Sequence, residues 1–205
     1  MKLIQIAGWL GSGKTTLIIA LGKGLSEMGT RVAILVNDIG AVPVDGKVIQ
    51  EYGLTVKEIG GGCICCQVAG NMLNTLRLLS EGQNPDVVIV EPTGVAVPSS
   101  IRDTILTGAR QFDISMGPII VLFDTTREDK LLNYESLKRL VTAQLKDADI
   151  IALSKADMVT DEVLKRAGEA MRLINSRAQV ISLSTHEGDG LSTLIQAAHE
   201  IVARV

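Results

Sequence analysis

All three cysteines of this 205-residue chain lie within four consecutive positions, at Cys63, Cys65 and Cys66. Glycines at 60–62 come directly before them. Thiolates are soft ligands, so this segment could hold Zn²⁺, Co²⁺, Ni²⁺ or Cu⁺, ions among which affinity alone does not select. The candidates for a fourth ligand are water, a residue of a partner protein, Asp38 and Glu58. The spacing therefore predicts a transition-metal site at the cysteines.

Two other interpretations of the thiols stay open. A buried cysteine can act as a small apolar side chain. Cys63 and Cys66 could also form a redox pair, although the thioredoxin-like context of such pairs is missing. A site of three ligands with an exchangeable fourth position suits metal transfer, whereas a closed site of four ligands suits a structural role.

A glycine-rich segment at residues 8–16, GWLGSGKTT, matches the phosphate-binding pattern G-x-x-x-x-G-K-[ST]. Glycines allow backbone angles that are closed to other residues, so amide groups can point at phosphate oxygens. Lys14 could reach the β- and γ-phosphates, and the Thr15 hydroxyl could ligate Mg²⁺. The predicted contacts with a nucleoside triphosphate are Gly8, Gly11, Ser12, Gly13, Lys14, Thr15 and Thr16.

The segment SKAD at 154–157 follows the fifth apolar run and is similar to the guanine-binding pattern [NT]-K-x-D. Asp157 would accept hydrogen bonds from guanine N1–H and the 2-amino group, and would reject adenine, which lacks both donors. Lys155 would lay its aliphatic stem over the base, and Ser154 stands where asparagine is usual. Ser184, after the last apolar run, could also touch the base. These residues favour GTP over ATP.

Acidic residues follow other apolar runs. Glu91 ends the run VVIVE, where a carboxylate could hold Mg²⁺ through water or orient the attacking water. The alternative is a helix-capping or exposed glutamate. An amide near Gly94 could sense the γ-phosphate. Asp38 and Asp45 lie where a switch loop is expected, and a solvated loop position explains each equally well. With Lys14, these acids form the candidate catalytic set. No arginine finger can be identified, so we expect slow intrinsic hydrolysis.

Short apolar runs alternate with longer segments of helical periodicity. The runs are continuous, as in strands buried on both faces of a parallel sheet. They span residues 2–7, 31–36, 86–91, 118–124, 149–154 and 178–184. Helices are expected at about 14–28, 69–80, 98–109, 131–146, 160–174 and 190–204. This order predicts one doubly wound α/β domain, a mostly parallel sheet flanked by helices. Residues 37–62 interrupt the order and predict a hairpin-like excursion.

The composition indicates a globular core of aliphatic side chains. Apolar residues make up 46% of the chain, aromatic residues only 2%, and the formal net charge is −3. A small charge without blocks of one sign argues against nucleic acid as a partner. The glycine loop comes too early to leave room for a signal peptide, and no apolar run is long enough to cross a membrane. We therefore expect a cytoplasmic protein with a single domain over 1–205 and reduced thiols.

Together these segments resemble the CobW/HypB/UreG family of P-loop GTPases, and most closely its CobW/P47K-like branch. The resemblance is carried by GWLGSGKTTL, VNDIGAVPVD (36–45), GGCICC (61–66), EPTG (91–94), PIIVLFD and QLKDADIIALSKAD (144–157). It implies a GTPase of the SIMIBI type that dimerises through nucleotide and delivers metals or matures metalloenzymes and cobalt cofactors. It assigns phosphate and Mg²⁺ to Lys14 and Thr15, the first switch to Asp38 and Asp45, the Walker B acid to Glu91, metal to Cys63, Cys65 and Cys66, and guanine to Asp157.

The chain departs from that branch at several places. Asp38 stands where glutamate is usual, and Ala41 stands where an acid is usual. The C-terminal CobW-type domain is expected to be absent, and there is no histidine-rich tract. His186 and His199, the only histidines, are expected at the surface.

The sequence therefore predicts a slow GTPase that binds GTP or GDP with Mg²⁺ and couples its nucleotide state to Zn²⁺, or alternatively Co²⁺ or Ni²⁺, at the cysteines. Its partner would be a client metalloprotein or corrinoid enzyme, and it would form a nucleotide-dependent homodimer. One alternative is a GTP-dependent assembly switch for a corrinoid or metal enzyme, with a structural cysteine site. A small-molecule P-loop kinase that prefers ATP is the other.

Overall fold

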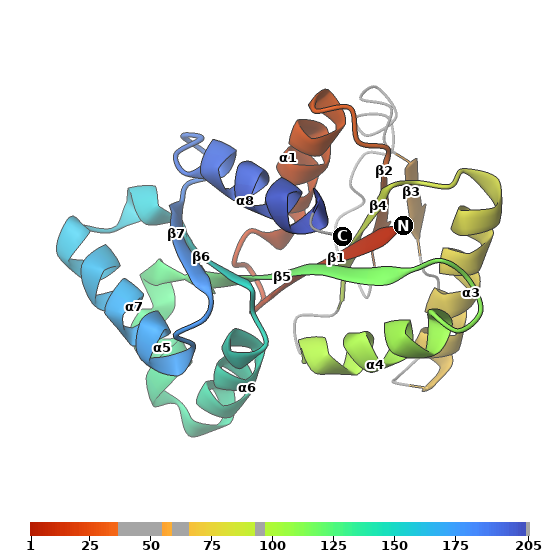
Figure 1. Ribbon diagram of the computed structural model, residues 1–205. Coiled ribbons are helices and arrows are strands. Elements are labelled where there is room, and N and C mark those ends of the chain that lie inside the picture. Colours follow the sequence, from red (N-terminus) through yellow and green to blue (C-terminus); the bar gives the residue numbers. More distant parts are fainter. Residues whose placement is uncertain (37–54, 59–65, 93–96, 204–205) are drawn as a thin grey trace.

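A seven-stranded sheet forms the centre of the protein in a computed structural model that describes residues 1–36, 55–58, 66–92 and 97–203 (Figure 1). The strands are β1 (Lys2–Gly8), β2 (Val32–Val36), β3 (Thr55–Glu58), β4 (Val87–Glu91), β5 (Ser115–Asp124), β6 (Ile150–Ser154) and β7 (Gln179–Leu183). Their order is β3-β2-β4-β1-β5-β6-β7, and every neighbouring pair is parallel. The predicted α/β fold with a parallel sheet is confirmed.

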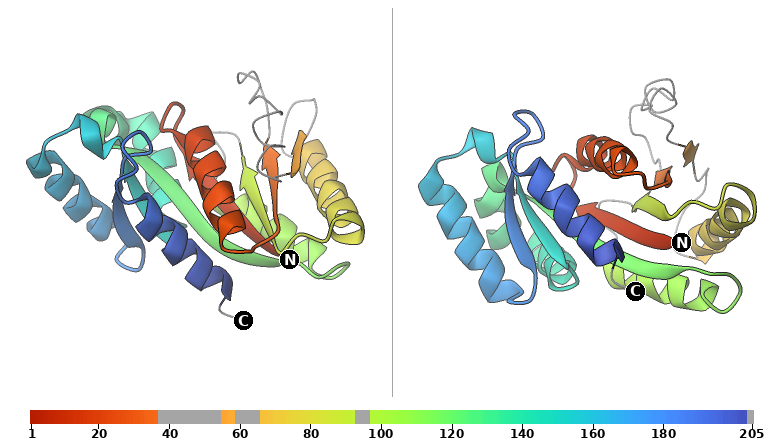
Figure 2. Two further views of the ribbon diagram at one scale, coloured as in Figure 1. Left: turned by 90° about the horizontal axis from the view of Figure 1, so that it is seen from above. Right: turned by 45° about the horizontal axis from the view of Figure 1, so that its top comes forward.

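Helices cover both faces of this sheet (Figure 2). They are α1 (Lys14–Glu27), α3 (Cys66–Gly82), α4 (Pro98–Gly108), α5 (Glu128–Asn133), α6 (Glu135–Lys146), α7 (Asp161–Ile174) and α8 (Leu191–Ala203), with the 3-10 turns η1 (Thr125–Arg127) and η2 (Ala156–Met158). α1 and α8 pack on one face. On the other face, α3 and α4 cover β2 and β4, while α5, α6 and α7 cover β5 and β6. Among the described helices, none has the length and apolar character needed to cross a membrane.

The strands are apolar on both faces because each face packs against helices. On β1, Ile4 and Ile6 contact the layer of α1 and α8, whereas Leu3 and Ala7 belong to the clusters on the opposite face. The edge strand β7 is the exception, since Gln179 is exposed there. Gln179 is the first residue of this edge strand, and Ile181 and Leu183 further along it are buried in the layer of α1 and α8.

Two expectations about secondary structure are wrong. Residues 55–58 do not belong to a hairpin but pair in parallel with β2, up to the register partners Val36 and Glu58. The helix predicted over 131–146 is two helices, α5 and α6, because Tyr134 between them has an extended backbone with ψ of 115°. The rest of the predicted excursion lies outside the described residues.

The parallel strands bring all their carboxyl ends to one edge of the sheet. In an open α/β sheet, ligands bind in the crevice beyond these ends. The turn after β1 and the last residues of β4, β5 and β6 all lie along this edge. These are the segments to which the sequence assigns phosphate, Mg²⁺ and guanine.

Candidate nucleotide-binding site

The glycine loop joins β1 to α1 at the carboxyl edge. Gly8, Gly11 and Gly13 have φ angles of +137°, +76° and +95°, which L side chains rarely adopt. At Gly8, a Cβ would also lie 2.5 Å from the carbonyl oxygen of Leu122 on the neighbouring strand β5. The loop delivers the chain into α1 at Lys14, and the first turn of α1 holds no acidic residue that would repel an anion.

Ser12 and Thr16 differ from the other predicted contacts of this loop. The Ser12 amide donates to the Trp9 carbonyl oxygen at 3.2 Å. The Ser12 hydroxyl is buried and has no hydrogen-bond partner among the described residues. It would lie 3.0 Å from a Cβ on Gly8, so it faces the core rather than the open side of the loop. Thr16 is exposed on the first turn of α1.

Lys14, Thr15 and Glu91 come together beside this loop. Glu91 ends β4, which pairs with β1. The Lys14 Nζ lies 3.9 Å from Glu91 Oε1, and the two side chains are 7% and 16% exposed. The Thr15 hydroxyl lies 3.5 and 3.3 Å from the two Glu91 carboxylate oxygens and can donate to either. Burial lowers the pKa of Lys14, and the charge of Glu91 partly opposes this effect. A hydroxyl and a carboxylate are hard oxygen donors of the kind that suits Mg²⁺.

The predicted base-binding residues gather after β6 and β7. Asp157 is exposed on η2, and a hydrogen bond from the Ser184 hydroxyl lowers the pKa of its carboxyl. The Glu187 amide donates to Ser184 Oγ at 3.0 Å, which leaves the hydroxyl proton of Ser184 free for Asp157. Ser154 is buried, and its hydroxyl donates to the Phe123 carbonyl oxygen at 3.2 Å. Ser154 thus ties the start of the base loop to the neighbouring strand β5.

The metal and switch predictions fall largely on residues whose structure is not described. Those outside the described residues are Asp38, Asp45, Cys63, Cys65 and Gly94. Cys66 is the first residue of α3, and Glu58 is the last residue of β3. Within the described ranges, no group of three His, Cys, Asp or Glu side chains could hold a metal ion. His186 is 85% exposed, as predicted, whereas His199 is half-buried.

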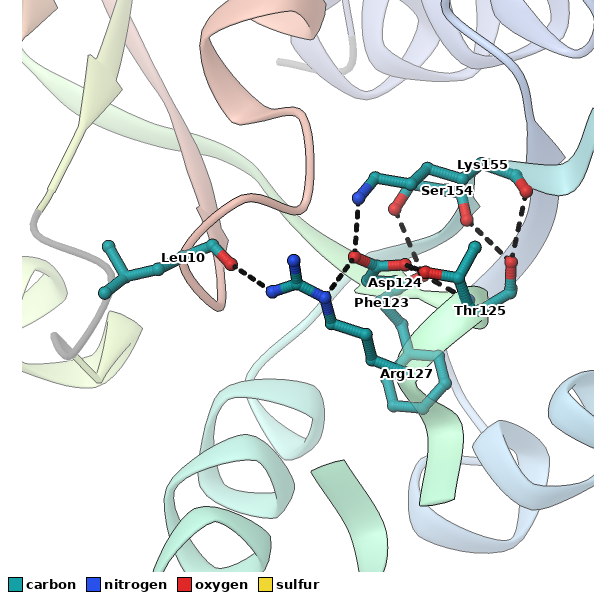
Figure 3. Close-up of polar contacts among 8 residues, drawn as sticks. Leu10, Phe123, Asp124, Thr125, Arg127, Ser154 and Lys155 are labelled. Atoms are coloured by element: carbon teal, nitrogen blue, oxygen red, sulfur yellow. Dashed lines mark hydrogen bonds and ion pairs between the residues drawn. The ribbon is translucent and has the colours of Figure 1, made fainter. Parts of the chain in front are cut away.

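Asp124 and Arg127 are structural features of the site that sequence reasoning missed (Figure 3). Asp124 ends β5 with 2% of its side chain exposed, and its Oδ2 accepts a hydrogen bond from Lys155 Nζ at 2.7 Å. The Nε of Arg127 lies 3.5 Å from the same oxygen, and its Nη1 donates to the Leu10 carbonyl oxygen at 3.3 Å. An acid at the end of an apolar run was a signal for Asp124, as it was for Glu91. No local pattern points to Arg127.

The sequence of this chain matches a known family of nucleotide-binding domains. A family model described as CobW/HypB/UreG, nucleotide-binding domain, matches residues 2–182. The chain belongs to the CobW/HypB/UreG family. The resemblance predicted from the glycine loop, the cysteine motif and the guanine pattern is therefore confirmed.

Curated relatives within the CobW/HypB/UreG family carry names that refer to zinc. The zinc chaperone YeiR of Escherichia coli (strain K12) is 34% identical over 159 residues, covering 77% of this chain and 47% of the relative. The zinc chaperone CobW of Sinorhizobium sp is 28% identical over 222 residues, covering 92% and 62%. The zinc-regulated GTPase metalloprotein activator 1 of Schizosaccharomyces pombe is 27% identical over 201 residues, covering 93% and 47%. The chain thus spans about half the length of these relatives, between 47% and 62%.

Solved structures of the same family share the fold. The hydrogenase maturation factor HypB from Archaeoglobus fulgidus matches with a TM-score of 0.71 and 20% identity, covering 98% of this chain and 90% of that one. The Zn(II)-bound YjiA GTPase from E. coli matches with a TM-score of 0.65 and 24% identity, covering 92% and 58%. Identities this low establish a common fold and nothing further.

Proposed function

We propose that this chain binds GTP and Mg²⁺ at the carboxyl edge of its sheet, hydrolyses GTP slowly, and uses its nucleotide state to control a metal site at Cys63, Cys65 and Cys66. The observation that carries the proposal is the convergence of Lys14, Thr15 and Glu91 beside the glycine loop. A GTPase of this kind would act as a metallochaperone or as a maturation factor for a client metalloprotein or corrinoid enzyme.

At the phosphate end of the site, the positive charge of Lys14 would be stabilised by an anionic ligand. The Lys14 ammonium is buried, and burial lowers its pKa. Phosphate oxygens at the loop would neutralise that charge and raise the pKa again. Mg²⁺ would supply charge neutralisation between the β- and γ-phosphates. Thr15 and Glu91, now hydrogen-bonded to each other, would hold the ion. We include Asp38 and Asp45 in the candidate catalytic set on the family pattern alone.

The base end supports guanine over adenine. The Asp157 carboxyl, whose pKa is lowered by the hydrogen bond from Ser184, is ionised at neutral pH and can only accept hydrogen bonds. Guanine offers two donors to such a carboxylate, whereas adenine would leave the charge without a partner. Lys155 and Ser154 would support the base. A preference for ATP in a nucleotide-competition assay would instead favour the small-molecule kinase.

The proposed link to metal rests on the register of the strands. Glu91 is the register partner of Val36, and Val36 is the register partner of Glu58. The segment that carries the cysteines runs from Glu58 to Cys66, and Cys66 begins α3. The ends of β4, β2 and β3 therefore lie side by side, so a change at Glu91 on nucleotide binding would reach the strand that leads to the thiols.

Zinc is the metal that we propose first. The relatives named zinc chaperone and the Zn(II)-bound YjiA support it. Nickel stays an alternative because a HypB from Helicobacter pylori was solved in complex with nickel. Cobalt is a further alternative on the chemistry of thiolate ligands. A nucleotide-dependent homodimer is part of the proposal, and Leu10, which is 58% exposed on the glycine loop, is an apolar side chain that such a contact could cover.

The decisive experiment measures zinc affinity of the reduced protein with a non-hydrolysable GTP analogue and with GDP. Coupling between two sites typically changes affinity by about 5- to 150-fold, so we expect a difference in this range. Equal affinities would remove the coupling, and failure to bind guanine nucleotides would remove the site. Cys65→Ser and Cys66→Ser should lower zinc affinity and leave GDP affinity unchanged.

A structural metal site is the second candidate. Cys66 is the first residue of α3, so a metal at this cysteine would also fix the start of a helix. The protein would then be an assembly switch whose metal does not exchange. In that case, Cys65→Ser and Cys66→Ser would lower the free energy of unfolding, and the bound zinc would not respond to nucleotide.

A further inference from the structure

One buried carboxylate joins the loop assigned to phosphate with the loop assigned to the base (Figure 3). Asp124 lies at the end of β5, between β1 and β6 in the sheet order. Its Oδ1 accepts hydrogen bonds from the Thr126 amide at 3.1 Å and the Thr126 hydroxyl at 2.6 Å. Its Oδ2 accepts from Lys155 Nζ at 2.7 Å and lies 3.5 Å from Arg127 Nε. Both carboxylate oxygens are therefore engaged, and the contact of Oδ2 with Lys155 is the one that comes from the base loop.

Arg127 extends this cluster to the glycine loop. Its Nη1 donates to the Leu10 carbonyl oxygen at 3.3 Å, across 117 positions of sequence. The guanidinium also lies over Gly11, where a Cβ would be 3.5 Å from Nη1 and 3.7 Å from Nη2. Gly11 has a φ of +76°, so its backbone angle favours glycine, while a Cβ there would make ordinary van der Waals contact with the guanidinium. Arg127 thus touches the loop at two consecutive residues.

The base loop is attached to the same short segment. Lys155 has a left-handed φ of +59°, which is unusual for a residue with a side chain. The Thr125 hydroxyl lies 2.8 Å from the Ser154 carbonyl oxygen and 3.3 Å from that of Lys155, and it can donate to either. The residues from Asp124 to Arg127 therefore contact both loops. They bind the base loop through its backbone carbonyls and the Lys155 side chain. They bind the glycine loop through the Leu10 carbonyl oxygen.

An ordinary exposed ion pair would not have this geometry. Two exposed charged side chains in contact typically contribute little, because water screens their charges and both chains lose conformational freedom. Here the carboxylate is only 2% exposed and faces two cations, so the three charges do not cancel. The planar fork of an arginine can contact a carboxylate and a carbonyl at once, whereas a lysine offers a single point charge. A displacement of Lys155 would therefore be passed through Asp124 to Arg127 and Leu10.

We infer that Arg127 is a positioning residue that couples recognition of the base to the phosphate loop. The inference rests on the proposed GTP site and deepens it. When guanine engages the base loop, Lys155 and the Asp124 carboxylate are held in place, and Arg127 then fixes the Leu10 carbonyl and the loop around it. Affinity for the phosphates accordingly depends on which base is bound.

The test is a thermodynamic cycle on the full chain with four nucleotides: GDP, GMP, IDP and IMP. Inosine nucleotides lack the 2-amino group that Asp157 would bind. Dissociation constants come from competition with a fluorescent GDP analogue, which also measures weak ligands. In the wild type, the affinity gained from the second phosphate should be at least about five-fold larger for guanine than for hypoxanthine. In Arg127→Gln the two gains should be equal.

Matched variants make the cycle decisive. Arg139→Gln removes an exposed arginine that pairs with Glu135 on α6 at 3.1 Å, and it should keep the wild-type ratio. Arg127→Lys keeps the charge without the fork, so its ratio should also fall, and it replaces Arg127→Gln if that variant does not fold. The ratio meant here is the affinity gained from the second phosphate with guanine, divided by the gain with hypoxanthine. The inference alone is overturned if folded Arg127→Gln or Arg127→Lys keeps the wild-type ratio. It is also overturned if the ratio of the wild type is one. A wild type that binds no guanine nucleotide overturns the proposed function and this inference with it.

Discussion

The substitution Lys14→Met replaces a buried charge with an apolar side chain of similar length. Lys14 is 7% exposed, and the nearest Glu91 oxygen lies 3.9 Å away, which is longer than a hydrogen bond. The ammonium is therefore poorly compensated in the free protein, as its lowered pKa also indicates. Replacing a whole buried ion pair by apolar residues is often neutral or stabilising, by about 1–4 kcal/mol, whereas removing one partner is destabilising when it leaves the other charge uncompensated. For Lys14, burial outweighs the attraction to Glu91, and Glu91 keeps the Thr15 hydroxyl after the substitution, so we expect a small gain of at most about 1 kcal/mol.

Lys155→Met is the matched substitution with the opposite expected sign. Lys155 Nζ lies 2.7 Å from the Asp124 carboxylate, which is 2% exposed. Its removal takes away a charged hydrogen bond from a buried acceptor, at a cost of about 1.5–3 kcal/mol. Both variants should lose nucleotide affinity, but for Lys14→Met the loss of function should come with a gain in stability.

The measurement is urea unfolding of the nucleotide-free proteins, first at neutral pH. The lowered pKa of Lys14 means that, between this pKa and 10.5, the unfolded wild type binds more protons than the folded protein. The stability of the wild type relative to Lys14→Met should therefore rise with pH in that window, and the advantage of the variant should shrink. If Lys14→Met instead loses as much stability as Lys155→Met, the argument from burial is refuted.

The remaining predictions concern other positions of the fold and the site. Gly190→Ala should cost more than about 3 kcal/mol in urea unfolding, because its Cβ would lie 1.9 Å from a backbone oxygen of β7 at a φ of +74°. Gly29→Ala, with φ of +85° and no described atom within 4 Å of its Cβ, should cost only about 1 kcal/mol. Gln5→Met should raise the melting temperature by about 2–4 °C, since the buried Gln5 amide lacks a partner among the described residues. Ser184→Ala should raise the pKa of Asp157 towards its usual value, so that GDP affinity in a pH titration is lost at a higher pH than in the wild type.

The glycine loop could be predicted from the sequence because its chemistry is local. Gly8, Gly11 and Gly13 are required by their own positive φ angles, and the spacing of the motif alone reveals these positions. The position of Glu91 beside Lys14 also followed, since an acid at the end of a buried parallel strand must reach the same edge as the loop after β1. The same argument for the last two strands placed Ser184 and Asp157 at one end of the site, whereas the hydrogen bond between them is seen only in the structure.

Two features of secondary structure were not predicted, because they depend on contacts between separate elements of the fold. Residues 55–58 have a short strand-like pattern, and nothing within them says whether their partner lies before or after them in the chain, or in which direction it runs. Tyr134 interrupts a segment that is amphipathic on both sides, so periodicity alone predicts one continuous helix. α5 and α6 pack against each other in the fold, and such packing is not visible in a window of residues.

Arg127 shows where a sequence argument ends. Its partners are a carboxylate three positions earlier and a carbonyl oxygen 117 positions earlier, and any residue type can supply a carbonyl. The strand ladder explains why such a contact is needed. On one side of β1, Glu91, Val36 and Glu58 are held together by backbone register alone. On the other side, the glycine loop and the base loop leave the sheet from β1 and β6, with β5 between them. Side chains after β5 must therefore bridge them, and Asp124 with Arg127 does so.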